Sequence, residues 1–228
     1  MKSKSLIAVL IALLVSSCML FTACGEEDFD ASAAVKESLD CIKSGNISDK
    51  YLELTQQSKE EAQKEYNDAM QEVVDEFMDV VDVEAYKTDE NEQNVRDFVK
   101  AMFASLKYEV SEEATKNDDG SYSVETKVYP IQAMTGMESY IENDLVNEWE
   151  KKVSNGSYKF TTEDQLMIDM MNDMLQKLTD QLNNTEYGDP QTVTMEIVYD
   201  EDEEMYEITD ESFDKLMNVA FGDGFGEE

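Results

Sequence analysis

The chain has 228 residues, with 53 Asp and Glu against 18 Lys and Arg, a formal net charge of −35 and no histidine. A surface this acidic repels phosphate backbones and argues against nucleic-acid binding. The lack of histidine excludes Ser-His-Asp and Cys-His catalysis and every histidine-containing zinc site, while the 41% hydrophobic content is enough for a packed core.

The first 23 residues have the organisation of a secretory signal peptide. Lys2 and Lys4 give a positively charged start, residues 6–15 form an unbroken apolar stretch, and small residues close the segment. The stretch is shorter than a convincing transmembrane span. We therefore predict that residues 1–23 are removed on export.

The end of this segment predicts a lipid anchor. Residues 20–25 read Leu-Phe-Thr-Ala-Cys-Gly, which is similar to the lipobox of bacterial lipoproteins, where the cysteine is diacylated and becomes the first residue. Two acyl chains such as palmitate, at about 0.8 kcal/mol per buried CH₂, anchor a protein stably. We predict acylation at Cys24, with Cys18 as the alternative, and an acylated tether over residues 24–30. Gly25 after the cysteine fits the outer face of the cytoplasmic membrane.

The third cysteine lies in the mature chain. Processing would remove Cys18 and acylate Cys24, which leaves Cys41 without a partner for an intramolecular disulfide. Cys41 lies beside Leu39 and Ile42 in an amphipathic stretch. We therefore expect a buried, structural thiol.

Three helices are expected after the tether, because apolar residues recur there at helical spacing. The first runs from Ser32 to Lys43 and ends at Gly45. The second follows the capping box Ser58–Glu61 and extends to about residue 83, and the third occupies residues 89–106.

Near residue 107 the apolar period changes from 3.6 to 2. Residues 108–112 and 122–128 alternate on either side of Asn-Asp-Asp-Gly, which predicts a β-hairpin. Two more helices are expected, one capped at residues 135–138 that ends near residue 155 and one over 162–184. A second hairpin over 193–208, a helix from Asp210 to about Phe221 and a frayed tail at 223–228 complete the chain.

This order predicts an α+β fold, with one domain over residues 31–222. Two hairpins supply a four-stranded antiparallel sheet, and several helices pack on one of its faces. The other face is expected to meet solvent, because charged residues occupy alternate strand positions, namely Glu109, Glu125, Lys127 and Glu196. The long second helix could instead extend away as part of a helical subdomain.

The whole resembles a family of Gram-positive surface lipoproteins of unknown function with a nuclear-transport-factor-2-like, or cystatin-like, domain. The resemblance rests on the lipobox, on Lys-Ser-Gly-Asn at 43–46, on the Asp-Asp-Gly hairpin at 118–120 and on Met-Tyr-Glu-Ile at 205–208 before Ser212. It implies a possible ligand-binding cavity between sheet and helices. The helix over 162–184 is an insertion relative to that family and leaves the strand order open.

Several acidic and sulfur-rich groups are candidate sites. Paired carboxylates could do acid–base work and the runs at 117–119 and 200–204 offer oxygen ligands for Ca²⁺, but acids are ordinary at turns and on solvated faces. Four methionines of the 162–184 helix could hold Cu(I), but their spacing favours a core stripe or an adaptable binding surface. They are Met167, Met170, Met171 and Met174.

The sequence therefore predicts a membrane-anchored, extracytoplasmic lipoprotein without catalytic residues, metal or cofactor, held on the lipid membrane through Cys24. Its partner would be a small apolar or cationic ligand, a peptide or another surface protein. Binding would use an apolar cavity or the acidic surface. The alternatives are an envelope scaffold and, ranked below it, a carboxylate-dependent cell-wall hydrolase.

Overall fold

The structure is a computed structural model that describes residues 20–22, 29–80, 86–134, 144–160, 162–201 and 204–222. Several predictions fall outside these residues. They are the signal segment before residue 20, the acylation site Cys24 with most of its tether, the helix cap at 135–138 and the tail at 223–228.

The predicted antiparallel sheet is confirmed. Its strands are β2 (Tyr108–Lys116), β3 (Tyr122–Val128), β4 (Gln191–Asp200) and β5 (Met205–Ile208). The order β5-β4-β3-β2 places the two hairpins side by side, because β3 pairs with β4 from Tyr122↔Ile197 to Val128↔Gln191. This register supplies the strand order that the sequence left open.

A short fifth strand, β1 (Leu20–Thr22), lies at the edge of this sheet beside β5. Its residues pair in antiparallel register, with Phe21 opposite Tyr206, and the Phe21 side chain is completely buried. This strand was not predicted, because the sequence pattern here is that of a signal peptide alone. Three residues are too few to show a period of 2, so no alternation could reveal it.

The period-2 pattern of the strands sorts their side chains between two environments. On β3, Val124, Thr126 and Val128 are buried, while Glu125 and Lys127 between them are exposed. Glu109 and Glu196 of the neighbouring strands are exposed as well. One face of the sheet therefore packs on helices and the other meets solvent, as predicted.

The hairpin between β2 and β3 is closed by the side chains that the sequence singled out. Gly120 adopts a φ of +88°, which only glycine reaches without strain. The Asp119 carboxylate accepts hydrogen bonds from the backbone N–H and the hydroxyl of Ser121, at 3.1 and 2.7 Å. Asp119 thus has a turn-forming role.

Most helices begin and end close to the predicted positions, but α3 (Asp49–Thr55) was not predicted, and the predicted start of the helix that ends near residue 155 lies outside the described residues. The Ser58–Glu61 capping box is present: the Ser58 N–H donates to the Glu61 carboxylate at 3.0 Å, and the Glu61 N–H donates to the Ser58 hydroxyl at 3.3 Å. The helices are α2 (Ala31–Ser44), α3 (Asp49–Thr55), α4 (Lys59–Val80), α5 (Asp89–Ala104), α7 (Val146–Ser154), α8 (Glu163–Asn183) and α9 (Asp210–Phe221).

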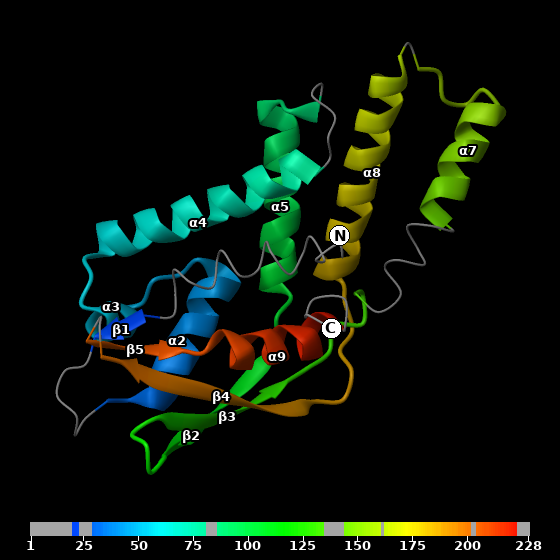
Figure 1. Cartoon of the computed structure of the whole chain (residues 1–228). Coiled ribbons are helices and arrows are strands. Elements are labelled where there is room, and N and C mark those ends of the chain that lie inside the picture. Colours follow the sequence, from blue (N-terminus) through cyan, green and yellow to red (C-terminus); the bar gives the residue numbers. More distant parts are fainter. Residues whose placement is uncertain are drawn as a thin grey trace.

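The helices form layers above the sheet (Figure 1). Helix α2 packs on β2 and β3, and α9 packs on β3 and β4, so these two helices cover the buried face. Helix α5 contacts α2 on one side and α4 and α8 on the other. Helices α4, α7 and α8 thus lie beyond the first helical layer, which agrees with the alternative of a helical subdomain.

Gly45, which ends α2, provides a direct test of the fold. It has a φ of +64°, and a Cβ atom built on it would lie 2.8 Å from Cε1 of the Tyr66 ring. We expect Gly45→Ala to lower the free energy of unfolding by about 2–4 kcal/mol, from backbone strain and from displacement of the ring. Urea unfolding measures the loss.

The matched control is Gly120→Ala. Gly120 also has a positive φ, but nothing lies within 4 Å of an added Cβ atom there. This variant should lose only the backbone component, about 1–2 kcal/mol. Equal losses in both variants would show that the contact between α2 and Tyr66 of α4 does not constrain the fold.

Candidate functional site

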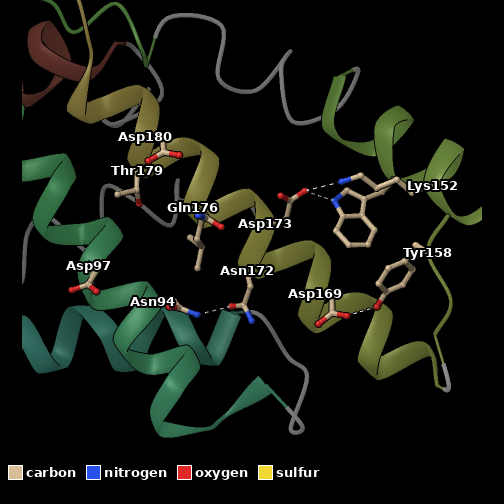
Figure 2. A pocket seen from close by; sticks show the side chains of 12 residues that line it. Asn94, Asp97, Lys152, Tyr158, Asp169, Asn172, Asp173, Gln176, Thr179 and Asp180 are labelled. Atoms are coloured by element: carbon tan, nitrogen blue, oxygen red, sulfur yellow. Dashed lines mark hydrogen bonds and ion pairs between the residues drawn. The ribbon is translucent and has the colours of Figure 1, made fainter.

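A cleft lies between helices α5, α7 and α8, away from the sheet. It has a volume of about 660 Å³, within the range of small-molecule sites. Figure 2 shows it with side chains from all three helices and from the segment after α7. Its lining residues are Asn94, Asp97, Trp149, Lys152, Tyr158, Asp169, Asn172, Asp173, Leu175, Gln176, Thr179 and Asp180.

Helix α8 forms the floor of the cleft. Asp169, Asp173, Gln176 and Asp180 are spaced three or four residues apart, which places them along one face of the helix. Leu175, Leu178 and Leu182 are buried on the side that packs on the core. The same helix therefore anchors itself through leucines and presents carboxylates to the cleft.

Trp149 of α7 forms one wall of the cleft. It is the single tryptophan of the chain, its side chain is buried, and its indole N–H donates to the Asp173 carboxylate at 2.7 Å. Its ring meets Tyr158 edge-on at 4.9 Å between centroids, and the Lys152 ammonium lies 4.6 Å from the Trp149 ring centroid. These contacts dock α7 against α8.

A ring of charges reinforces this docking. Glu148 lies 2.8 Å from Lys152 and 2.7 Å from Lys177, and Lys177 lies 3.1 Å from Asp173. Hydrogen bonds from Lys152 and Lys177 lower the pKa of Glu148 to about 2. Although burial acts in the opposite direction, hydrogen bonds to Glu148 and Asp173 raise the pKa of Lys177. Glu148 and Lys177 are thus held in their charged forms.

Tyr158 closes the far end of the cleft. Its hydroxyl donates to the Asp169 carboxylate, and this bond is visible in Figure 2. Burial and the hydrogen bond to Asp169 raise the pKa of Tyr158 to about 12, so the phenol stays protonated at neutral pH. Phe160 stacks beside Tyr158 at 6.3 Å and is 39% exposed.

An amide network joins α5 to the floor of the cleft. Asn172 Oδ1 accepts from the Tyr86 hydroxyl and from Asn94 Nδ2, both at 3.1 Å. Asn172 Nδ2 donates to Asn91 Oδ1 at 2.9 Å, and Asn91 Nδ2 donates to the carbonyl of Tyr86 at 2.8 Å. Because both polar atoms of the Asn172 amide are satisfied within the protein, the network sets how α5 and α8 sit together.

The cleft carries an excess of negative charge. Four aspartates and one lysine line it, a formal charge of −3. Asp169 and Asp173 are already engaged by tyrosine, tryptophan and lysine side chains. Asp97, which accepts a hydrogen bond from Gln93 at 2.7 Å, and Asp180 are exposed at the opening. The cleft can therefore attract a cation to its opening while the contacts of Asp169 and Asp173 with the cleft wall stay intact.

The other groups singled out from the sequence have structural surroundings. Cys41 is a buried free thiol, as predicted. Met171 and Met174 pack against the core, in line with a core stripe, whereas Met167 is 48% exposed. Within the described residues, acidic and cysteine side chains nowhere gather in a group of three that could hold a metal ion.

Sequence reasoning did not identify the cleft. The candidates on the 162–184 helix were its methionines and not its acidic face, where Asp169, Asp173 and Asp180 recur at helical spacing. That spacing could have predicted an acidic face on this helix. The contributions of Trp149 and Asn94 could not be predicted, because these residues lie more than 20 and 70 residues away in the chain from their partners on α8.

Glu148→Gln tests whether the charge ring holds α7 in place. The pKa of Glu148 lies below its ordinary value of 4.5, so its stabilisation is present above pH 4.5 and is lost as the pH falls toward 2. The side chain is 44% exposed, and we expect a loss of at most about 1 kcal/mol at pH 6 and no difference near pH 2. Urea unfolding followed by Trp149 fluorescence measures the free energy of unfolding at both pH values.

Glu150→Gln is the matched control, because Glu150 is an exposed acid on the same helix. It removes the same charge and should leave the free energy of unfolding unchanged within about 0.5 kcal/mol. A pH-independent loss in Glu148→Gln would contradict the role of its carboxylate charge.

Comparisons with known proteins place the fold. No protein-family model matches the sequence, and no curated protein matches it either. The crystal structure of YcdA, a candidate lipoprotein from Bacillus subtilis, is similar to this chain with a TM-score of 0.55 at 14% sequence identity. The similarity covers 84% of this chain but only 56% of that one. The likeness to YcdA therefore shows a shared fold.

Within the described ranges, no helix has the length and apolar character needed to cross a bilayer.

Proposed function

We propose that the protein is a lipid-anchored extracytoplasmic binding protein whose cleft between α5, α7 and α8 takes a cationic ligand. Two independent observations support the anchor: the lipobox that ends at Cys24 and the fold shared with a protein named as a candidate lipoprotein. The bacterial, Gram-positive origin and the nuclear-transport-factor-2-like assignment remain predictions from sequence. The ligand is inferred from the cleft.

The observation that carries the binding proposal is the combination of charge and aromatic surface in a cleft of about 660 Å³. Cations are attracted by a net charge of −3 at short range, and an alkyl chain or guanidinium plane packs well on the faces of aromatic rings. The exposed carboxylates Asp97 and Asp180 would meet the charged groups of the ligand. Tyr158 would meet its carbon chain, beside the buried ring of Trp149.

These features favour an extended organic cation over a metal ion. Asp169 and Asp173 already accept hydrogen bonds from protein donors, so they lack the free, convergent oxygens that Ca²⁺ requires. An oligoamine, or the side chains of a basic peptide, can instead satisfy separate carboxylates spread along α8. The ligand class is therefore a linear molecule with two or more ammonium or guanidinium groups.

Binding without catalysis is the role that the titratable groups favour. A general acid needs a carboxyl group whose pKa is raised in a cleft. Among the described residues, each carboxylate whose pKa departs from its ordinary value is shifted downward, and these include Glu148, which pairs with Lys152 of the cleft. Such carboxylates remain charged at neutral pH and suit a cation-binding role better than that of a hydrolase.

Spermidine, a linear triamine, is the probe for this proposal. We expect it to change the fluorescence of Trp149 in a saturable way, because that ring forms the wall of the cleft. Asp97→Asn and Asp180→Asn should each weaken binding roughly two- to fivefold, since each removes one partly screened charge. Titration at fixed ionic strength measures the dissociation constants.

Asp119→Asn is the matched control, because it removes one exposed acid in the hairpin between β2 and β3 and leaves the cleft intact. It should leave the dissociation constant unchanged within about twofold. An equal weakening in all three variants would mean that spermidine only condenses on the acidic surface, and the cleft would not be the site.

A further inference from the structure

We propose that the edge of β5 and the buried position of Phe21 form an acceptor groove for an extended peptide with a large apolar side chain. Removal of residues 1–23 opens this groove. The inference rests on one part of the proposed function, namely cleavage before Cys24. It concerns a surface at the opposite end of the molecule from the cation-binding cleft (Figure 1).

The chain itself demonstrates that a strand fits there. β1 pairs with β5 in antiparallel register, from Leu20↔Glu207 to Thr22↔Met205. The Phe21 side chain has no exposed surface and belongs to the hydrophobic core. β1 also contacts α3, so the strand lies between a sheet edge and a helix. This edge therefore supplies both backbone pairing and an apolar site, or seat, for the side chain at the position of Phe21.

An aromatic cluster forms the floor of that seat. The ring of Phe29 stacks on Tyr206 at 4.1 Å between centroids and lies 6.2 Å from Phe21. Tyr122 lies 5.5 Å from Phe29 and 5.7 Å from Tyr206. Three of the four rings belong to the chain downstream of Cys24, so cleavage would remove only Phe21. The remaining rings would line the space that it leaves.

Cleavage would also expose the backbone of β5. The sheet order is β1-β5-β4-β3-β2, so loss of β1 makes β5 an edge strand. An unpaired edge presents a row of N–H and C=O groups that pair readily with another extended chain. The first five residues of the processed chain read Cys-Gly-Glu-Glu-Asp, which offers no large apolar side chain to replace Phe21.

Charge selects the occupant. β5 carries Glu207 and follows directly on Glu204, in a chain with a net charge of −35. Pairing two copies of β5 would bring these like charges together, which disfavours a second copy of this chain. An extended segment that lacks acids and has lysine or arginine beside its apolar residue is complementary instead. The occupant is therefore a basic peptide strand with a central aromatic residue.

A labelled peptide based on β1, Lys-Met-Leu-Phe-Thr-Ala-Lys, tests this groove. Three forms of the protein are compared in detergent: the processed chain, the full chain kept unprocessed by Cys24→Ser, and that full chain with Phe21→Asp. We expect the peptide to bind the processed chain and the Phe21→Asp form at least about tenfold more tightly than the unprocessed chain, because β1 occupies the groove in the unprocessed chain. Fluorescence anisotropy measures the binding.

Two controls keep the test specific. Replacing the peptide's Phe by Ala should weaken binding at least about tenfold, because the seat is then unfilled. A second full-chain variant, Phe21→Ala, should also admit the peptide, and near-ultraviolet circular dichroism verifies that both variants keep their tertiary structure.

The outcomes separate this inference from the proposed function. Equal binding to all three forms, or binding to none, would overturn the groove. A processed chain that forms dimers through β5 and excludes the peptide would overturn the peptide as occupant. If the chain from cells keeps residues 1–23 but the Phe21→Asp form binds the peptide, the predicted cleavage before Cys24 is wrong, whereas the peptide-binding groove at β5 is supported.

Discussion

The position of α5 between two layers is the constraint on which the rest of the structure depends. Its apolar residues, Val95, Phe98, Val99, Met102 and Phe103 among them, are buried. The helix contacts α2 of the sheet layer on one side and α4 and α8 on the other. Asn172 then ties α8 to α5 through an amide whose two polar atoms are both satisfied. Asn91, which accepts from Asn172, is buried, and a buried amide left unpaired costs about 1–3 kcal/mol, so this network favours one relative position of the two helices. That position turns the acidic face of α8 toward α7, and the cleft lies between them.

The large negative charge divides into two kinds of surface. Most acids lie on exposed helix faces and at turns, where pairs such as Lys64 with Asp68 and Lys215 with Glu211 are exposed and contribute little to stability. Around the cleft the acids are instead held by Trp149, Tyr158 and two lysines, and the carboxylate of Glu148 stays ionised down to about pH 2. The buried face of the sheet is free of charge on β3, which presents Val124, Thr126 and Val128. The charged groups beside the cleft are therefore tied together where α7 meets α8, and that cleft is where we place ligand binding.

The fold could be predicted from local patterns, because these decide helix ends and hairpins. The Ser58–Glu61 capping box and the Asp-Gly turn before β3 make the hydrogen bonds that their sequences predict. Helix α3 was missed because seven residues show barely two helical turns, and β1 because three residues show no period. The cleft could not be derived in this way. It depends on the rotation of α8 against α5, which Asn172 and its distant partners set, and one sequence contains no measure of that rotation.

Cleavage and acylation at Cys24 link the proposed function to the β5 edge, since both assume that residues 1–23 are absent from the working protein. The most direct test is the intact mass of the protein extracted from membranes of the cells that make it, together with sequencing of its N-terminal peptide. We predict a chain that begins at Cys24 and carries two or more acyl groups on that residue. A chain that retains residues 1–23, or that begins at another residue without lipid, would contradict the lipid anchor.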